Sequence, residues 1–199
     1  MHRISRRLAV VLAVVLVFVG AAAGASAATV LHFGHKQIRS GLPTGIGHFK
    51  LTSTDVRSGH PIPAQFWGCE DAGISPQLSW RGAPAGTKSF AVSLFDPDAP
   101  TGSGFWHWTA WDLPATTTSL PTAAVLPPGA VNGPNDGGGT GYTGPCPPEG
   151  DITHNYVFTV VALSIPALEL AATTPPPVVG FVVGHNALAS ATLTATARQ

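Results

Sequence analysis

Residues 89–114 read "SFAVSLFDPDAPTGSGFWHWTAWDLP", and this stretch decides the fold class. Its first eight residues, "SFAVSLFD", form an almost continuous apolar run that ends at Asp96, which is typical of a buried β-strand. Its last nine, "WHWTAWDLP", alternate between apolar and polar side chains and are stopped by Pro114. The prolines and glycines between them cannot continue either strand. The stretch therefore predicts two sequential strands joined by a stiff connection.

The same pattern of alternation and of proline and glycine stops, followed outward from this pair, predicts more short strands than helices. Strands are predicted at 49–53, 78–80, 154–164 and 189–197. The segment "HNYVFTVVALS" at 154–164 is the strongest of them, because β-branched and aromatic residues dominate it. One short helix is predicted at about 178–188, where Gly180 and Gly184 each weaken it by about 1 kcal/mol relative to alanine.

The composition favours a β-rich fold with long loops. The 199 residues suit one domain with extensions, and 44% of them are hydrophobic, which is enough to bury a core. The 23 glycines and 19 prolines, many of them clustered, disfavour a helical protein. The chain has ten lysines and arginines and ten aspartates and glutamates. The composition therefore shows no excess of basic residues that would indicate binding to nucleic acid.

The N-terminus has the organisation of a secretory signal peptide. A basic start, "MHRISRR", precedes the apolar run "LAVVLAVVLVFVG", and the small residues "ASA" before Ala28 form a cleavage site. We therefore expect a signal peptide at 1–27, an N-terminal tether at 28–47 and the domain at 48–199. The alternative is a retained membrane anchor, which the glycines within the apolar run disfavour. The expected location is exported, secreted or in the cell envelope or periplasm, with no membrane span after cleavage.

Cys69 and Cys146 are the two cysteines of the chain. In an exported protein such a pair is readily interpreted as a disulfide. The alternative is two buried thiols that never meet, because a bridge requires a short distance between Cα atoms that the sequence does not supply. Both interpretations stay open at this point.

A long segment at 132–150, "NGPNDGGGTGYTGPCPPEG", separates the two strongest predicted strand regions. It holds seven glycines and four prolines in nineteen residues. A loop of this length inside a compact domain is usually functional or disordered. Glycine permits close approach of backbone to a ligand, and proline stiffens the chain, so the mixture favours a shaped wall over a flexible linker.

Five chemically active side chains lie where predicted strands meet loops. Asp96 and Asp98 end one strand, and His107 opens the next. His154 and Tyr156, two residues apart, project from one face of the strongest strand. Histidines that become cationic and a phenol can donate hydrogen bonds to phosphate or another small anion, while the carboxylates orient the imidazoles. Taken singly, each residue also has an ordinary explanation as a turn or core residue.

Several motifs in this order resemble the phosphatidylethanolamine-binding protein family, in particular its bacterial and archaeal Raf-kinase-inhibitor-like branch. The specific pair is "DPDAP" followed by "HW" nine residues after its last aspartate, and then "GYTGPCPPEGDITHNYVF". Supporting matches are "IPAQF" with "CED", "ISPQLSW" and "GHNALASATLTATA". The resemblance runs from about Phe49 to Ala197, nearly all of the expected domain.

The resemblance implies a mainly β fold, in which two antiparallel sheets pack as a β-sandwich-like domain with one or two short helices. It also implies a preformed pocket for phosphate or phospho-headgroup ligands such as phosphorylethanolamine. It makes Asp96–Pro97 a candidate for a cis peptide bond. We expect no catalytic residues, no metal and no cofactor. The implied ligand-binding residues are Asp96, Asp98, His107, His154, Tyr156, Gly144, Pro145, Pro147 and Pro148.

Three other functions stay open. An exported inhibitor or regulator of a protease or kinase would act through surface loops on an unknown protein target. A hydrolase would use the acids and histidines in general acid–base catalysis, although no serine or cysteine lies in an obvious nucleophile motif. A metal site would take His107, His154 and one aspartate as two-His-one-carboxylate ligation. The favoured function remains the binding of a small anionic ligand, without turnover.

Overall fold

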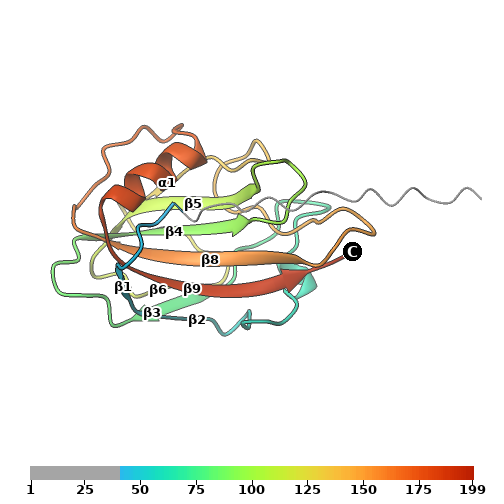
Figure 1. Cartoon of the computed structure of the whole chain (residues 1–199), viewed down its shortest axis with the longest axis horizontal. Coiled ribbons are helices and arrows are strands. Elements are labelled where there is room, and N and C mark those ends of the chain that lie inside the picture. Colours follow the sequence, from blue (N-terminus) through green and yellow to red (C-terminus); the bar gives the residue numbers. More distant parts are fainter. Residues whose placement is uncertain (1–40) are drawn as a thin grey trace, which may run out of the picture. The chain divides into compact units, whose positions relative to one another are not determined.

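The computed structural model describes residues 41–199, which form two β-sheets and a single α-helix (Figure 1). The predicted signal peptide and most of the predicted tether, residues 1–40, lie outside the described residues. The six-stranded sheet has the order β1-β9-β8-β4-β5-β7, and the three-stranded sheet has the order β2-β3-β6. The elements are β1 (Gly47–His48), β2 (Lys50–Thr52), the 3-10 helix η1 (Ala64–Phe66), β3 (Leu78–Arg81), β4 (Ser89–Asp96), β5 (Phe105–Pro114), β6 (Ser119–Leu120), β7 (Val131–Asn132), β8 (His154–Leu163), α1 (Pro176–His185) and β9 (Ala187–Ala197).

The stretch that opened the sequence analysis forms the centre of the larger sheet. β4 pairs antiparallel with β5 on one side and with β8 on the other. β9 pairs with β8 along nearly its whole length, from His154 opposite Ala197 to Leu163 opposite Ala187. The four long strands β5, β4, β8 and β9 are therefore neighbours, and their ends define the two ends of the domain (Figure 1).

The predicted fold class is confirmed. Pairing is antiparallel throughout both sheets, with the single exception among the described strands of β1, whose two residues run parallel to β9. Such a short strand contributes few hydrogen bonds to the sheet. It places the chain along the edge of the sheet at the boundary between the predicted tether and the predicted domain.

The main core lies between the two sheets and is built from the alternating side chains of the long strands. Val92 and Leu94 on β4 and Phe158 and Val160 on β8 point into it, and all are almost fully buried. Trp80 of the smaller sheet meets Phe90 there, with ring centroids 5.5 Å apart. Period-two alternation thus determines which side chains reach the core and which reach the opposite, outer face.

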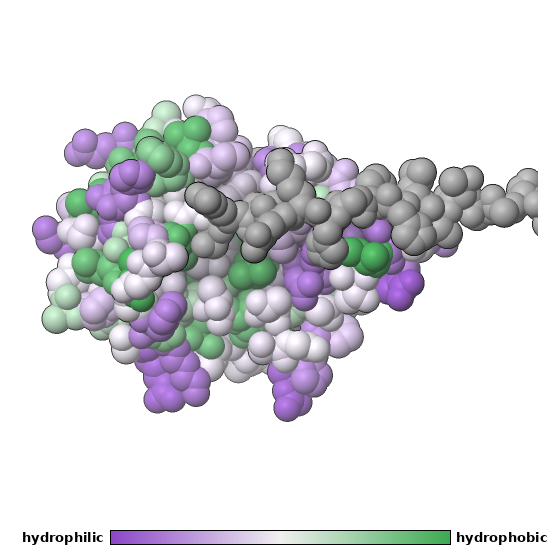
Figure 2. All heavy atoms as spheres, in the orientation of Figure 1, coloured by the Kyte–Doolittle hydropathy of each residue, from purple (hydrophilic) through white to green (hydrophobic). Residues whose placement is uncertain are grey.

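The outer face of the larger sheet is covered in part by α1. The helix begins at Pro176, earlier than predicted, because proline is accepted in the first helical turn, where its missing N–H costs nothing. A Cβ on Gly184 would lie 2.3 Å from the carbonyl oxygen of Gly41, so this glycine is required by close packing against the entering chain. Figure 2 shows apolar residues over α1, where the side chain of Phe181 is 63% exposed. None of the helices among the described residues is long and apolar enough to cross a membrane.

Candidate ligand-binding site

The antiparallel register brings the predicted site residues to one end of the larger sheet. Asp96, the last residue of β4, pairs with Phe105 at the start of β5, and Phe95 pairs with Val157 near the start of β8. The end of β4 therefore meets the beginnings of both neighbours. Segments that are nearly sixty residues apart in sequence, such as Asp96 and His154, come into direct contact in this way.

His154 lies between two carboxylates. Its Nδ1 is 2.8 Å from Oδ2 of Asp96, and its Nε2 is 3.2 Å from Oδ2 of Asp151. Burial by itself would lower the pKa of His154, but the hydrogen bonds and charges of Asp96 and Asp151 outweigh burial and raise the pKa above its ordinary value. A cationic imidazole can donate to both carboxylates at once, which agrees with the raised pKa.

His107 has the opposite electrostatic character. Its Nδ1 is 3.1 Å from the carbonyl oxygen of Thr143, which can only accept, so Nδ1 carries the proton. Burial lowers the pKa of His107 to about 4; backbone contacts with Thr143 and Gly144 oppose this shift, and the charge of His154 adds to it. His107 is thus neutral at pH 7 and presents an unprotonated Nε2. This differs from the expectation that both histidines become cationic.

Tyr156 is fully buried beside both imidazoles. Its ring centroid lies 5.2 Å from that of His107 in an edge-on arrangement and 6.4 Å from that of His154 in a stacked one. Burial raises the pKa of the phenol, and the adjacent carboxylate of Asp96 raises it further. The hydroxyl therefore stays protonated and is a hydrogen-bond donor at every physiological pH.

Asp98 holds the start of β8 through two hydrogen bonds to Asn155. Its Oδ2 accepts hydrogen bonds of 2.8 Å from both the backbone N–H and the side-chain amide of Asn155. Its carboxylate therefore ties the turn after β4 to the start of β8. Its charge still acts on the cluster, because it contributes to the raised pKa of Tyr156.

The Asp96–Pro97 peptide bond is trans, as are all peptide bonds in residues 41–199, so the cis prediction is wrong. The turn explains this. Oδ1 of Asp96 accepts the backbone N–H of Asp98 at 2.8 Å and of Ala99 at 3.1 Å. An aspartate side chain that accepts the backbone N–H groups two and three residues later forms an Asx-type turn. Such turns commonly have a trans proline at their second position.

The wall predicted from "GPCPP" is held from behind by a second loop, residues 66–72. The N–H of Gly144 donates to the carbonyl of Ala72 at 2.9 Å, and the N–H of Gly68 donates to the carbonyl of Pro145 at 3.0 Å. A Cβ on Gly144 would lie 2.2 Å from the carbonyl oxygen of Phe66, so only glycine fits there. The amide of Gly144 is already engaged, and the residue shapes the site instead of offering its N–H to a ligand.

The two cysteines join these same loops. Cys69 and Cys146 form a disulfide with their Cα atoms 5.0 Å apart. Both residues are exposed at the surface, which excludes the alternative of two separate buried thiols. Among the prolines of the wall, Pro145 and Pro147 are buried and Pro148 is exposed.

The cluster is nearly closed to solvent. The exposed fractions are 2% for Asp96, 1% for His154 and 0% for Tyr156, against 6% for His107. No group of three or more metal-ligating side chains able to hold an ion occurs among the described residues, so the two-His-one-carboxylate alternative is not supported. The arrangement is a hydrogen-bonding site in which one imidazole is charged, the other is neutral and a phenol lies between them.

Three contributors were missed from the sequence. Asp151 precedes His154 by three residues, and an acid so close to a histidine in a chain with ten acids was a usable signal. Thr143 and Ala72 act only through their carbonyl oxygens, which every residue has. No sequence pattern identifies such backbone contributions, because they depend on where the loops cross.

Comparison with known proteins agrees with the geometry. A family profile described as phosphatidylethanolamine-binding protein matches residues 52–198. The UPF0098 proteins YbcL and YbhB of Escherichia coli K12 are each 44% identical to this chain over 73% of its length, and the matches cover 85% and 98% of those proteins. The crystal structure of E. coli YbcL, described as a member of the mammalian PEBP family, matches with a TM-score of 0.74 and 40% identity, covering 77% of this chain and 99% of that one. LppC of Mycobacterium tuberculosis H37Rv, named as a lipoprotein, is 40% identical over 71% of this chain and 65% of its own.

Proposed function

Because the chain belongs to the phosphatidylethanolamine-binding protein family, we propose that the cluster around His107, His154 and Tyr156 binds a phosphorylated headgroup, with phosphorylethanolamine preferred over inorganic phosphate. The observation that carries this proposal is the charge arrangement of the cluster. Asp96 and Asp151 flank the cationic His154, and the charge of Asp98 reaches the same cluster.

A zwitterion suits this arrangement better than a simple anion. Carboxylates repel a bare phosphate at short range, and partial burial strengthens that repulsion. In phosphorylethanolamine the ammonium group can approach the carboxylates while the phosphate accepts hydrogen bonds from His154 and the hydroxyl of Tyr156. The unprotonated Nε2 of His107 can accept a hydrogen bond from a phosphate that still carries a proton. All the polar groups of the ligand then have partners.

Ligand entry requires a local rearrangement. His154 already donates to Asp151, whose carboxylate therefore occupies the place that a phosphate oxygen would take. We infer that the ligand replaces Asp151 at Nε2 of His154. The loop that carries Asp151 follows the exposed Pro148, so this exchange does not disturb the core.

The test is calorimetric titration of the purified protein with phosphorylethanolamine, inorganic phosphate and ethanolamine. We expect saturable binding of phosphorylethanolamine, roughly tenfold tighter than phosphate, the equivalent of one screened charge pair. His107→Ala should weaken it by about tenfold or more, which is the cost of one hydrogen bond to a charged group. The matched control is His185→Ala, an exposed histidine on α1.

Two outcomes would contradict the proposal. One is unchanged affinity in a His107→Ala variant whose circular dichroism and unfolding curve show a native fold. The other is an affinity for inorganic phosphate equal to that for phosphorylethanolamine. The carboxylates would then not select the ligand through its ammonium group.

Binding without turnover is proposed ahead of hydrolysis and inhibition. Cys146, the cysteine nearest the cluster in sequence, is held in a disulfide and cannot supply a thiolate nucleophile. Release of phosphate from phosphomonoesters, lost in Asp96→Asn, would favour a hydrolase instead. Inhibition of a protease or kinase that survives loss of His107 would favour action through the surface loops.

An exported or envelope location fits two observations. Disulfides persist in oxidising compartments outside the cytoplasm, and Cys69–Cys146 is one. The relative LppC is named as a lipoprotein, a class of protein attached to the cell envelope. We propose that the headgroup site works outside the cytoplasm.

A further inference from the structure

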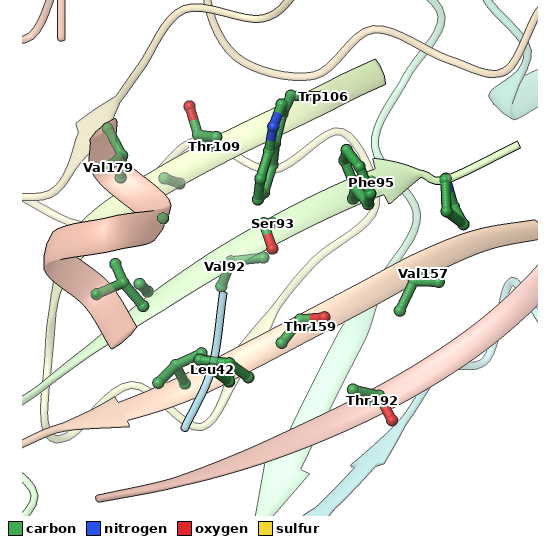
Figure 3. A pocket seen from close by; sticks show the side chains of 16 residues that line it. Leu42, Val92, Ser93, Phe95, Trp106, Thr109, Val157, Thr159, Val179 and Thr192 are labelled. Atoms are coloured by element: carbon green, nitrogen blue, oxygen red, sulfur yellow. The ribbon is translucent and has the colours of Figure 1, made fainter. Parts of the chain in front are cut away.

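A cavity of about 230 Å³ lies on the outer face of the larger sheet (Figure 3). Val179 of α1 lies on one side of it, and Phe95 and Trp106 lie on another (Figure 3). Val183 of α1 also lines it. Neither imidazole of the cluster lines this cavity. The alternation along β4 and β8 separates the two sites, because neighbouring residues of a strand face opposite sides of the sheet.

The floor of the cavity is a row of hydroxyl side chains that crosses four strands. In the sheet register, Ser93 on β4 pairs with Thr109 on β5 and with Thr159 on β8, and Thr159 pairs with Thr192 on β9. All four residues line the cavity. With strands about 4.8 Å apart, the row is about 14 Å long and runs across the strands.

The hollow exists because the floor is made of small residues between large walls. A wholly packed outer face would have larger side chains at these positions, as in the neighbouring part of the sheet where Val161 and Trp111 pack against α1. α1 and Trp106 lie side by side, since a Cβ on Gly180 would be in ordinary van der Waals contact with the indole ring at 3.4 Å. The space between the two walls is not filled by described side chains.

The polarity of the lining defines the kind of molecule that fits. The hydroxyl of Thr109 donates to the carbonyl of Pro134 at 2.9 Å. Within residues 41–199, no hydrogen bond is found for the hydroxyls of Ser93, Thr159 and Thr192. None of the lining residues carries a charge. Thr192 is exposed, so the row opens to solvent at that end. A charged group placed deeper in the cavity would lose its hydration without a compensating partner, whereas a single hydroxyl or carbonyl group would find several.

We infer that this cavity is a second binding site, for an uncharged, elongated apolar molecule with one hydroxyl or carbonyl group. An engineered cavity of about 150 Å³ holds benzene, so 230 Å³ corresponds to roughly nine non-hydrogen atoms. The molecule lies along the hydroxyl row, with its polar group on Ser93 or Thr159 and its apolar part between α1 and Trp106. This site does not depend on the proposed headgroup function, because it uses the other face of the sheet.

The test uses 1-octanol, which has nine non-hydrogen atoms, and octanoate as its charged counterpart. Methyl NMR of the intact protein follows the valines that line the cavity. We expect saturable shifts of Val157, Val161, Val179 and Val183 with octanol, at a Kd of the order of 10⁻⁴ M for a ligand of this size. Octanoate should bind at least about tenfold more weakly.

Variants distinguish the cavity from unspecific apolar binding. Thr159→Leu fills the floor and should abolish octanol binding, and Ser93→Val provides a second filling variant if the first folds poorly. Thr159→Val keeps the shape but removes the hydroxyl, so affinity should fall by about threefold to tenfold. The matched control is Thr52→Val, an exposed threonine on β2 of the other sheet.

Three results would overturn the inference. They are the absence of saturable shifts in the intact chain, unchanged octanol affinity in a folded filling variant, and octanoate binding as tight as octanol.

Discussion

At the scale of single residues, two histidines of one cluster differ in charge, one cationic and one neutral, because their neighbours differ. His154 contacts two carboxylates, and its pKa is raised. His107 contacts a backbone carbonyl and aromatic rings, and burial lowers its pKa to about 4. The same residue type therefore acts as a cationic donor at one position and as a neutral acceptor at the other.

This difference predicts a measurable dependence on pH. Between pH 6.5 and about 4 the unfolded chain protonates His107 while the folded protein does not, so stability falls as pH falls. The raised pKa of His154 acts in the opposite direction, since its contribution is present below pH 6.5 and is lost as pH rises through its folded pKa. Histidine NMR should show one ring titrating near 4 and another above 6.5.

The contribution of His107 can be isolated with a variant. As the pH falls from 7 to 5, the lowered pKa of His107 should reduce the free energy of unfolding of the wild-type protein by about 2 kcal/mol. The variant His107→Gln should lack this reduction. Urea unfolding of both proteins at the two pH values provides the comparison. If the assigned ring signal of His107 titrates near 6.5, then His107 is not held neutral in the folded protein.

Asp151 is the second residue-scale prediction. Replacement by asparagine removes a negative charge 3.2 Å from His154, so the pKa of His154 should fall. In the proposed headgroup site the same change removes repulsion of phosphate, worth about 1 kcal/mol or roughly fivefold in affinity. Calorimetry with inorganic phosphate measures this gain.

A matched control accompanies this variant. Glu169→Gln removes an exposed carboxylate elsewhere and should leave phosphate affinity unchanged. Weaker phosphate binding in Asp151→Asn would mean that Asp151 positions the site and does not compete with the ligand.

At the scale of elements, the site is built by strand ends and fixed by two crossing loops. β4, β5 and β8 deliver the side chains, and the contact between Gly144 and residues 66–72 fixes the wall. The Cys69–Cys146 disulfide links these loops across 77 residues of sequence. The disulfide therefore joins the loop of residues 66–72 to the segment around Gly144 that forms the wall of the site.

Loss of the disulfide should therefore destabilise the protein. The double variant Cys69→Ser, Cys146→Ser should lose about 4 kcal/mol in free energy of unfolding by the chain-entropy relation. The backbone hydrogen bonds of Gly68 and Gly144 persist, so the folded state should keep its sheets. Urea denaturation with far-UV circular dichroism measures both. Wild-type protein under a reductant is the control, and equal stability of oxidised and reduced protein would contradict the prediction.

At the scale of the whole molecule, the two faces of one sheet carry different chemistry. The inner face ends in the charged cluster, and the outer face holds the uncharged cavity under α1. The residues near Leu42 pack on the outer face with this helix, so the chain enters the domain beside the cavity.

The predicted processing is tested on the whole chain. Expression with the native N-terminus in a bacterial host should yield an exported protein whose first residue is Ala28, because "ASA" precedes it. Mass spectrometry of the exported fraction identifies this end. Ala28→Pro next to the cut should block cleavage, and a protein retained at full length in the wild type would support the anchor alternative.

The sequence by itself determined the strands, the order of the site motifs and the identity of the titratable side chains. These follow from local rules, since period-two alternation, β-branched runs and proline stops depend only on neighbouring residues. Asp96, His107, His154 and Tyr156 were found for this reason, and the register then brought them together. The disulfide partners were visible as a pair, although their distance was not.

Only the tertiary structure decided which charge each histidine carries, that Asp98 bonds Asn155, and that Asp151 caps His154. It also placed Ser93, Thr109, Thr159 and Thr192 in one row beneath α1. Burial and proximity set these properties, and both arise from contacts between segments far apart in sequence. A threonine in a strand has the same local pattern on a flat surface as on the floor of a cavity, so no rule of sequence distinguishes the two.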